Sequence, residues 1–145
     1  EEPLDTVKKY ASFASIHEDI MDLPKQYETL VGERGVTLSG GQKQRISLAR
    51  ALIKNPSCIV LDDCLSAVDA TTENNIVKHF NAGLANKTTL VITHRLHSQM
   101  DYDKILVIEK GKIAEFGSHN ELIKNKSLYF DMFQQQSLDE VDHLN

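Results

Sequence analysis

The sequence predicts an α/β fold: two parallel strands flanked by helices, a helical portion before them, and a β-hairpin plus helices after them. Three observations support this. The apolar runs "SCIVL" and "TTLVITH" are separated by one amphipathic helix, and such strand–helix–strand units are right-handed with parallel strands. Capping-box patterns precede several stretches of helical periodicity. The run "KILVIEKGKIAEF" is typical of a hairpin that turns at Lys110-Gly111.

The N-terminal portion is predicted to be helical. Pro3 suits a first helical turn, and apolar residues follow it at helical spacing. The pattern "SIHE", Ser15 to Glu18, fits a capping box that opens a second short helix, which Pro24 stops. We expect the following "KQYETLVGERGVT" to be a connector.

A long amphipathic helix follows the connector. Ser39 and Gln42 fit a second capping box at its start, and Asn55-Pro56 ends it. Its predicted inner face consists of Ile46, Ala49, Leu52 and Ile53. The next run, "SCIVL", is continuous and apolar, which predicts a strand buried on both faces.

Asp69 is predicted to cap the helix between the two strands, and that helix ends near Gly83. Its predicted inner face consists of Ile76, Val77, Phe80 and Leu84. A second buried strand, "TTLVITH", comes next. After the hairpin, "SHNE" (Ser118 to Glu121) is a third capping-box candidate, and Leu128, Phe130 and Phe133 predict a last helix.

Composition restricts the class of protein. A chain of 145 residues can form one domain with a modest core, and its net charge of −5 argues against a nucleic-acid module. No apolar run approaches the roughly 20 residues that span a bilayer. Cys58 and Cys64 lack zinc-ligand spacing, so we expect reduced thiols that pack as small apolar residues. The chain does not begin with Met, and we expect it to be a piece of a longer protein.

Polar side chains stand at the ends of both predicted strands. Asp62 and Asp63 end the first strand, and His94 follows the second. Because ligands of open α/β sheets bind beyond the carboxyl ends of the strands, we expect these three groups to face one crevice. Two carboxylates there suit Mg²⁺ and an activated water, with a histidine beside them. Each feature alone is more often a turn or a cap, so their order along the chain carries the argument.

Five motifs occur in an order that resembles the ATPases of the ABC family. "LSGGQ" at 38–42 resembles their signature motif, and "CIVLDD" at 58–63 resembles their Walker B strand. "SAVD" at 66–69 resembles their D-loop, and His94 in "VITHRL" resembles their switch histidine. "VGERG" at 31–35 is similar to the segment before the signature in ABC exporters. The resemblance covers nearly the whole chain except its tail.

The resemblance implies ATP and Mg²⁺ as ligands and a head-to-tail dimer of two nucleotide-binding domains. Each ATP then lies between the phosphate loop of one domain and the signature of the other. The signature residues that would contact the partner's ATP are Leu38, Ser39, Gly40, Gly41 and Gln42. A helix start suits this task because its unpaired N–H groups and positive dipole end favour an anion, and glycines permit close approach.

The other roles are carried over in the same way. Asp62 would hold Mg²⁺ through water, and Asp63 and His94 would be catalytic. The D-loop would contact the partner through Ser66, Ala67, Val68 and Asp69. Coupling to a transmembrane domain would use Gly32, Glu33, Arg34 and Gly35.

Asp63 departs from the family, which normally has Glu as the general base at this position. The aspartate is one methylene shorter, so its carboxylate falls short by about 1 Å, which is enough to cost roughly 100-fold in rate. Exporters with this substitution are often one half of an asymmetric pair, so the resemblance allows either a homodimer or a heterodimer with one weak site.

The family's phosphate loop, GxxxxGK[ST], does not occur in these 145 residues. The resemblance therefore implies a partial P-loop NTPase (ABC ATPase) core that binds ATP poorly alone and shows no ATPase activity. We expect a helical subdomain portion at 1–55, the C-terminal half of the ATPase core at 56–136 and a polar tail at 137–145. The expected location is the cytoplasmic face of a membrane, as part of an exporter that does not bind nucleic acid.

Two alternatives remain open. A soluble ABC ATPase that acts on DNA or ribosomes would more often show basic stretches or a long coiled-coil insertion. A regulatory half would bind ATP with little hydrolysis, and Asp63 favours that possibility over full activity at this subunit's own site.

Overall fold

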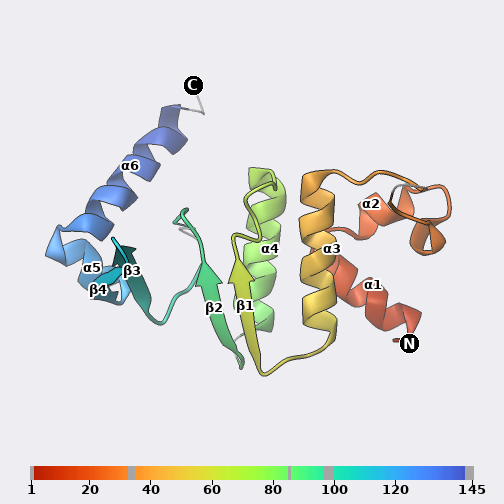
Figure 1. Ribbon diagram of the computed structural model, residues 1–145, viewed down its shortest axis with the longest axis horizontal. Helices are drawn as coiled ribbons and strands as arrows, with labels where there is room; N and C mark the ends of the chain where they lie inside the picture. Colours follow the sequence, from red (N-terminus) through yellow and green to blue (C-terminus); the bar gives the residue numbers. More distant parts are fainter. Residues whose placement is uncertain (1, 33–34, 85, 97–99, 143–145) are drawn as a thin grey trace. The chain divides into compact units, whose positions relative to one another are not determined.

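The computed structural model describes residues 2–32, 35–84, 86–96 and 100–142, and the side chains as far as Leu138 (Figure 1). The chain forms two compact units, Glu1–Thr93 and His94–Asn145. No helix in the described part of the chain combines the length and the apolar character needed to cross a bilayer.

The first unit begins with a helical part, as predicted. Its elements are α1 (Leu4–Phe13), α2 (His17–Met21), a 3₁₀ turn η1 (Gln26–Glu28) and α3 (Gly40–Ile53). The predicted cap of α2 is wrong, because the N-cap is Ile16 and Ser15 has a positive φ of 53°. Ser15 instead ends α1 in a left-handed conformation, and the Ile16 N–H bonds the Ala11 carbonyl across it at 2.9 Å.

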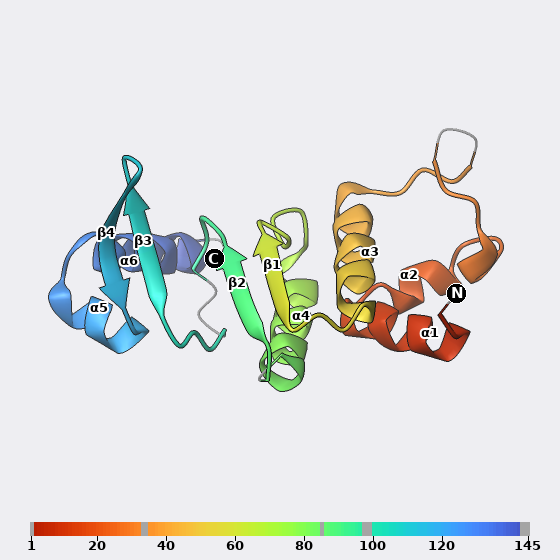
Figure 2. The same cartoon turned by 60° about the horizontal axis from the view of Figure 1, so that its bottom comes forward.

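The sheet of the first unit consists of β1 (Cys58–Asp62) and β2 (Thr88–Ile92), joined through α4 (Ala70–Gly83). The strands are parallel, which confirms the prediction, and Asp62 lies opposite Ile92. The prediction of burial on both faces is wrong. Ile59 and Leu61 are buried, whereas Val60 is 56% exposed and its neighbour Leu90 is 53% exposed. In the described part of the chain, α4 covers one face of this sheet (Figures 1 and 2).

Two helices position the sheet's carboxyl end. All four residues of the inner face predicted for α4 are buried, with Leu84 at the C-cap, and Asp69 caps the helix start by accepting the Thr72 N–H at 3.0 Å. Helix α3 buries Leu48 and Leu52, so its predicted face was only partly right. Helix α3 packs against α1, and Ile46, Ala49 and Ile53 of the predicted face are half-buried.

The second unit is a hairpin with two helices. Strands β3 (Ile105–Glu109) and β4 (Lys112–Gly117) are antiparallel, and helices α5 (His119–Asn125) and α6 (Leu128–Asp142) follow. The hairpin turns at Lys110-Gly111, as predicted, and both residues have positive φ. Val107, Leu122 and Tyr129 form its buried cluster. Helix α6 continues into the segment predicted as a polar tail.

Candidate functional site

The start of α3 is built by the predicted capping box. The Ser39 hydroxyl accepts the Gln42 N–H at 3.1 Å, and the Gln42 side-chain oxygen accepts the Ser39 N–H at 3.0 Å. Gly40 and Gly41 occupy the first two helical positions, whose N–H groups have no partner within a helix. The box therefore fixes the geometry of a helix start at which further N–H donors remain.

Charge distinguishes this helix start from the others. The first turn of α3 contains no acidic residue, whereas the first turns of α1, α2, α4, α5 and α6 each contain at least one. An acidic residue in the first turn offsets the positive end of the helix dipole. In α3 that end is left to favour an anion from outside the helix.

The two glycines of this start are required for different reasons. A Cβ on Gly41 would lie 2.6 Å from the carbonyl oxygen of Ala67, so the segment after β1 packs directly against Gly41. A Cβ on Gly40 would meet only the Ala67 Cβ, at an ordinary 3.8 Å. Packing within the described chain thus explains a glycine at position 41, whereas no close contact of the described residues requires one at position 40.

Gln44 ties α3 to the turn that follows β1. Its side-chain nitrogen donates to the Ser66 hydroxyl at 2.9 Å and to the Asp63 carbonyl at 3.4 Å. Its side-chain oxygen accepts the Ala67 N–H at 3.0 Å. The sequence analysis missed this residue, although it lies in the stretch "LSGGQKQR" beside the signature. One glutamine therefore joins the helix start to the candidate catalytic turn.

The two predicted carboxylates lie at the carboxyl end of β1, as expected. Asp62 is the last residue of the strand and is exposed. Asp63 begins the turn with a φ of 46°, and its N–H donates to the Ile92 carbonyl at 2.8 Å. The next residue, Cys64, is half-buried, and burial raises the pKa of its thiol to about 11, so the thiol is protonated at neutral pH.

The donor set at this turn fits Mg²⁺ only with help from a ligand. The described residues contain no group of three or more His, Cys, Asp or Glu side chains placed to hold a metal ion. Mg²⁺ is commonly held by one or two carboxylates together with waters and substrate phosphates. Asp62 and Asp63 are consistent with that arrangement, in which the nucleotide supplies the remaining oxygens.

The predicted D-loop makes contacts inside the chain. The Ser66 hydroxyl donates to the Asp63 carbonyl at 3.1 Å, and Val68 is buried. Asp69 caps α4, and the Thr72 N–H lowers the pKa of the Asp69 carboxyl. Contact of this segment with a partner domain stays a prediction.

The connector before α3 closes on itself. The Val36 N–H bonds the Leu30 carbonyl at 3.0 Å, and the Gly32 N–H bonds the Val36 carbonyl at 3.2 Å. Gly32 has a φ of 121°, and a Cβ on Gly35 would collide with the Leu30 carbonyl. Leu30 is 81% exposed. The predicted coupling residues Glu33 and Arg34 lie outside the described residues.

His94 is the first residue of the second unit. It follows β2 after Thr93, as the sequence analysis expected. Its proximity to Asp62 and Asp63 stays a prediction.

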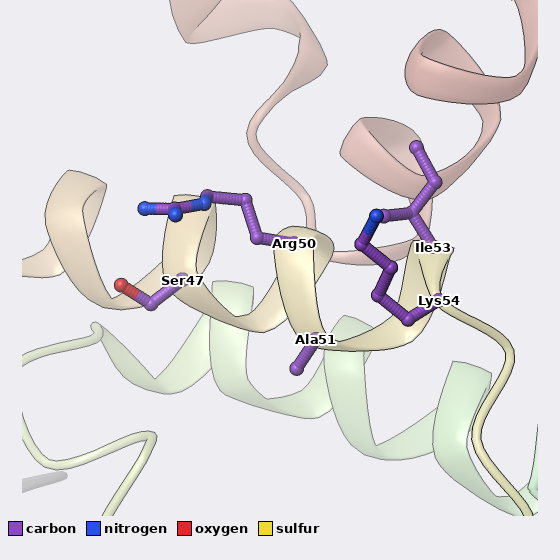
Figure 3. A pocket seen from close by; sticks show the side chains of 5 residues that line it. All are labelled: Ser47, Arg50, Ala51, Ile53 and Lys54. Atoms are coloured by element: carbon purple, nitrogen blue, oxygen red, sulfur yellow. The ribbon is translucent and has the colours of Figure 1, made fainter. Parts of the chain in front are cut away.

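Neither of two surface hollows contains a predicted site residue. One, of about 500 Å³, is lined by Ser47, Arg50, Ala51 and Ile53 of α3 and by Lys54, the C-cap of that helix (Figure 3). The other, of about 220 Å³, lies in the second unit beside the contact of 2.8 Å between His119 and the Tyr129 hydroxyl. The predicted site residues that the structure describes therefore lie outside both hollows, at the start of α3 and in the turn after β1.

Comparison with known proteins adds family evidence to this geometry. Residues 5–66 match the sequence profile of a family described as ABC transporter. The chain is 49% identical over 132 residues to ABC transporter B family member 4 of Dictyostelium discoideum. This match covers 91% of this chain and 17% of that protein. It is 48% identical over 132 residues to a probable multidrug resistance ABC transporter ATP-binding/permease protein of Bacillus subtilis, covering 91% of this chain and 23% of that protein.

A solved structure agrees with these sequence matches. The chain resembles a bacterial Atm1-family ABC exporter with ATP bound, with a TM-score of 0.81 and 42% identity, over 91% of this chain and 23% of that one. The chain thus spans about a fifth of the length of these two relatives. The fold is consistent with a partial core of this family.

Proposed function

The chain belongs to the ABC transporter family as part of an ATP-binding domain, and from this membership we propose that it serves ATP-driven export in a dimer. The observation that carries the proposal is the start of α3. This is a capped helix start with no acidic residue in its first turn, and its Gly40 has no packing requirement within the described chain. These properties suit the terminal phosphate of an ATP held by a partner domain.

In this proposal the signature acts on the partner's ATP. The hydroxyl of Ser39 and the N–H groups of Gly40 and Gly41 would donate to phosphate oxygens, while Leu38 would line the approach. Gln42 would support the loop, because both ends of its amide already bond protein groups, Ser39 and Asp19. Stabilisation of charge by such preorganised donors is a major source of catalysis in phosphoryl transfer.

The turn after β1 would act on the ATP held by this subunit. Asp62 would contribute to Mg²⁺ binding through water, and the ion when bound would offset phosphate charge. Asp63 would polarise the attacking water, and His94 would help position it. The short Asp63 side chain is expected to make this the slower of the two sites.

The partners in this proposal are a second nucleotide-binding domain and a transmembrane domain. Residues 66–69 would contact the second domain, and the connector would face the cytoplasmic side of the transmembrane domain. The exposed Leu30, together with Val31 at 53% exposure, gives the connector an apolar surface suited to a protein contact. The relatives' names favour a transporter over a soluble ABC ATPase.

A hybrid exporter tests the proposed function. This chain replaces the matching segment of 132 residues in the Bacillus subtilis relative, to which it is 48% identical. We expect the purified hybrid to hydrolyse ATP, and Asp62→Asn to lower the rate by about 100-fold. Asp103→Asn, at an exposed position of the second unit, is the matched control and leaves the rate unchanged. A folded hybrid whose rate is insensitive to Asp62→Asn would contradict the proposal.

Asp63 supports a second candidate, a regulatory half that binds ATP with little hydrolysis at its own site. The variant Asp63→Glu restores the missing methylene and is expected to raise turnover of the hybrid by about tenfold or more. An unchanged rate would count against a site weakened by Asp63.

A further inference from the structure

We propose that Asp19 on α2 is a positioning residue for the start of α3, and that α2 thereby links the connector to the ATP-binding signature. The contacts of Asp19 stand on the geometry alone. Their effect on ATP turnover rests on the proposed function.

Asp19 holds two residues of α3 at once. Its Oδ1 atom accepts the Gln42 side-chain N–H at 2.9 Å and the Arg45 guanidinium at 3.2 Å. The side chains of Arg45 and Asp19 are 13% and 29% exposed. Hydrogen bonds between ionised groups in such a partly buried setting are stronger than exposed ones, so the pair restricts how α3 can sit on α2.

Arg45 extends the same contact to the backbone. Its guanidinium donates to the Ser15 carbonyl at 2.7 Å and to the Gly41 carbonyl at 3.4 Å. Ser15 joins α1 to α2, and Gly41 lies in the first turn of α3. The guanidinium therefore ties the first turn of α3 to the α1–α2 junction.

Pairing with Arg45 also resolves an electrostatic conflict. A lone carboxylate beside Gln42 would oppose an anion at the start of α3. Arg45 offsets this charge, and Asp19 itself lies in the first turn of α2, where a negative charge is favourable. The pair thus fixes the helix start without cancelling its preference for an anion.

A second contact leads from α2 towards the connector. The Nδ1 atom of His17 lies 2.8 Å from the Tyr27 hydroxyl, and the two rings are 5.9 Å apart. Tyr27 belongs to η1, at the beginning of the connector. A displacement of the connector would move Tyr27, then the five-residue helix α2, and through Asp19 the start of α3.

Amide hydrogen exchange on the full 145-residue chain tests the positioning role. Asp19→Ala removes both contacts, and Asp19→Asn keeps an acceptor for Gln42 but loses the charge that pairs with Arg45. We expect Asp19→Ala to speed exchange at residues 43–46 by about tenfold, and Asp19→Asn to give a smaller increase. Exchange at residues 48–53 and in α4 should change by less than about twofold.

The matched control is Asp22→Ala, an exposed aspartate at the C-cap of the same helix. This variant should leave exchange at residues 43–46 unchanged. Equal effects of Asp19→Ala and Asp22→Ala, or a uniform rise throughout the first unit, would overturn the positioning role.

The hybrid exporter tests the consequence for catalysis. Asp19→Ala should lower kcat for ATP by about five- to tenfold and change KM by less than about twofold, because a misplaced signature affects closure more than initial ATP binding. Tyr27→Phe should reduce stimulation of ATP hydrolysis by a transported compound and leave basal turnover unchanged. An active hybrid in which both variants behave like Asp22→Ala would refute this inference and leave the proposed function standing. A hybrid without ATPase activity would count against the proposed function, while the exchange experiment still decides on Asp19.

Discussion

Helices α3 and α5 begin with the same capping box, but their helix starts have different chemistry. In α5 the Glu121 carboxylate accepts both the Ser118 N–H at 2.7 Å and the Ser118 hydroxyl at 2.8 Å. In α3 the neutral Gln42 accepts the Ser39 N–H, and among the described residues the Ser39 hydroxyl donates to no acceptor. The two capping boxes differ at the third helical position, which is Glu in α5 and Gln in α3. With Glu, the serine hydroxyl donates a hydrogen bond within the box.

The comparison shows how one local motif can be either structural or functional. Glu121 brings its own negative charge to the start of α5, so that helix start is electrostatically complete. Helix α3 is equally well capped but keeps a serine proton, two glycine N–H groups and an uncompensated dipole end. Capping alone therefore predicts a helix, and the charge of the capping residues predicts whether the start can take an anion.

Exchanging the two boxes should produce the largest effect. Gln42→Glu gives α3 the capping box of α5. The new carboxylate accepts a hydrogen bond from the Ser39 hydroxyl, which is then not available to phosphate, and its charge repels phosphate. We expect ATP hydrolysis by the hybrid exporter to fall by about 100-fold. The reciprocal variant Glu121→Gln should leave hydrolysis unchanged. Gln42 also contacts Asp19, so Gln42→Glu should be repeated in the presence of Asp19→Asn. A rate restored to that of Asp19→Asn alone would assign the loss to repulsion by Asp19, whereas a persisting loss would assign it to repulsion of phosphate.

The glycines sharpen the comparison next. Helix α5 begins with His119 and Asn120, so a capping box does not itself require glycine. Gly41→Ala would place a Cβ against the Ala67 carbonyl and should cost about 1–3 kcal/mol in the free energy of unfolding. Gly40→Ala meets no such obstacle and should be neutral or stabilising by up to about 1 kcal/mol. Urea denaturation of the two variants measures this difference, and equal losses would contradict the separate roles of the glycines.

Gln44 should have a slightly smaller effect on stability. Gln44→Ala removes the bonds to Ser66 and Ala67 and should cost about 1–2 kcal/mol. Lys43→Ala, on an exposed neighbour, is the control and should stay within about 0.5 kcal/mol of the unaltered chain. Denaturant titration measures the stability of both variants. Similar unfolding midpoints for Gln44→Ala and Lys43→Ala would show that the bonds of Gln44 do not contribute to stability.

Local patterns predicted most of the fold. The capping boxes of α3 and α5, the cap of α4 and the parallel strands were all predictable, because each depends on residues close in sequence or on a general rule of handedness. The cap of α2 was not, since Ser15 could serve either the end of α1 or the start of α2, and packing of Arg45 on its carbonyl favours the first.

Burial and the ties of the candidate site were harder to predict. The apolar run of β1 predicts burial on both faces, but burial depends on which elements cover a sheet, and Val60 is exposed. Asp19 and Gln44 each bond a residue 23 positions away in the sequence, and no local sequence pattern predicts these contacts. The motif residues Ser39 to Gln42 could be predicted because their chemistry is carried by one helix start. The contacts that hold that start in place come from other elements.

The smallest expected effect is a dependence on pH confined to α5. The hydrogen bonds that the Glu121 carboxylate accepts from the backbone N–H and the hydroxyl of Ser118 lower the pKa of Glu121 from 4.5 to about 2, and the charge of Lys104 adds to the shift. A carboxyl with a lowered pKa stabilises the folded state when ionised, so this contribution is complete above pH 4.5 and is lost as the pH falls to about 2. The box of α3 contains no titrating group and should contribute nothing in this window. Thermal unfolding at pH 5 and at about pH 2.5 should therefore show a smaller loss on acidification for Glu121→Gln than for the unaltered chain. Equal losses would mean that the Glu121 charge does not complete the start of α5, and the contrast with α3 would then rest on the glycines alone.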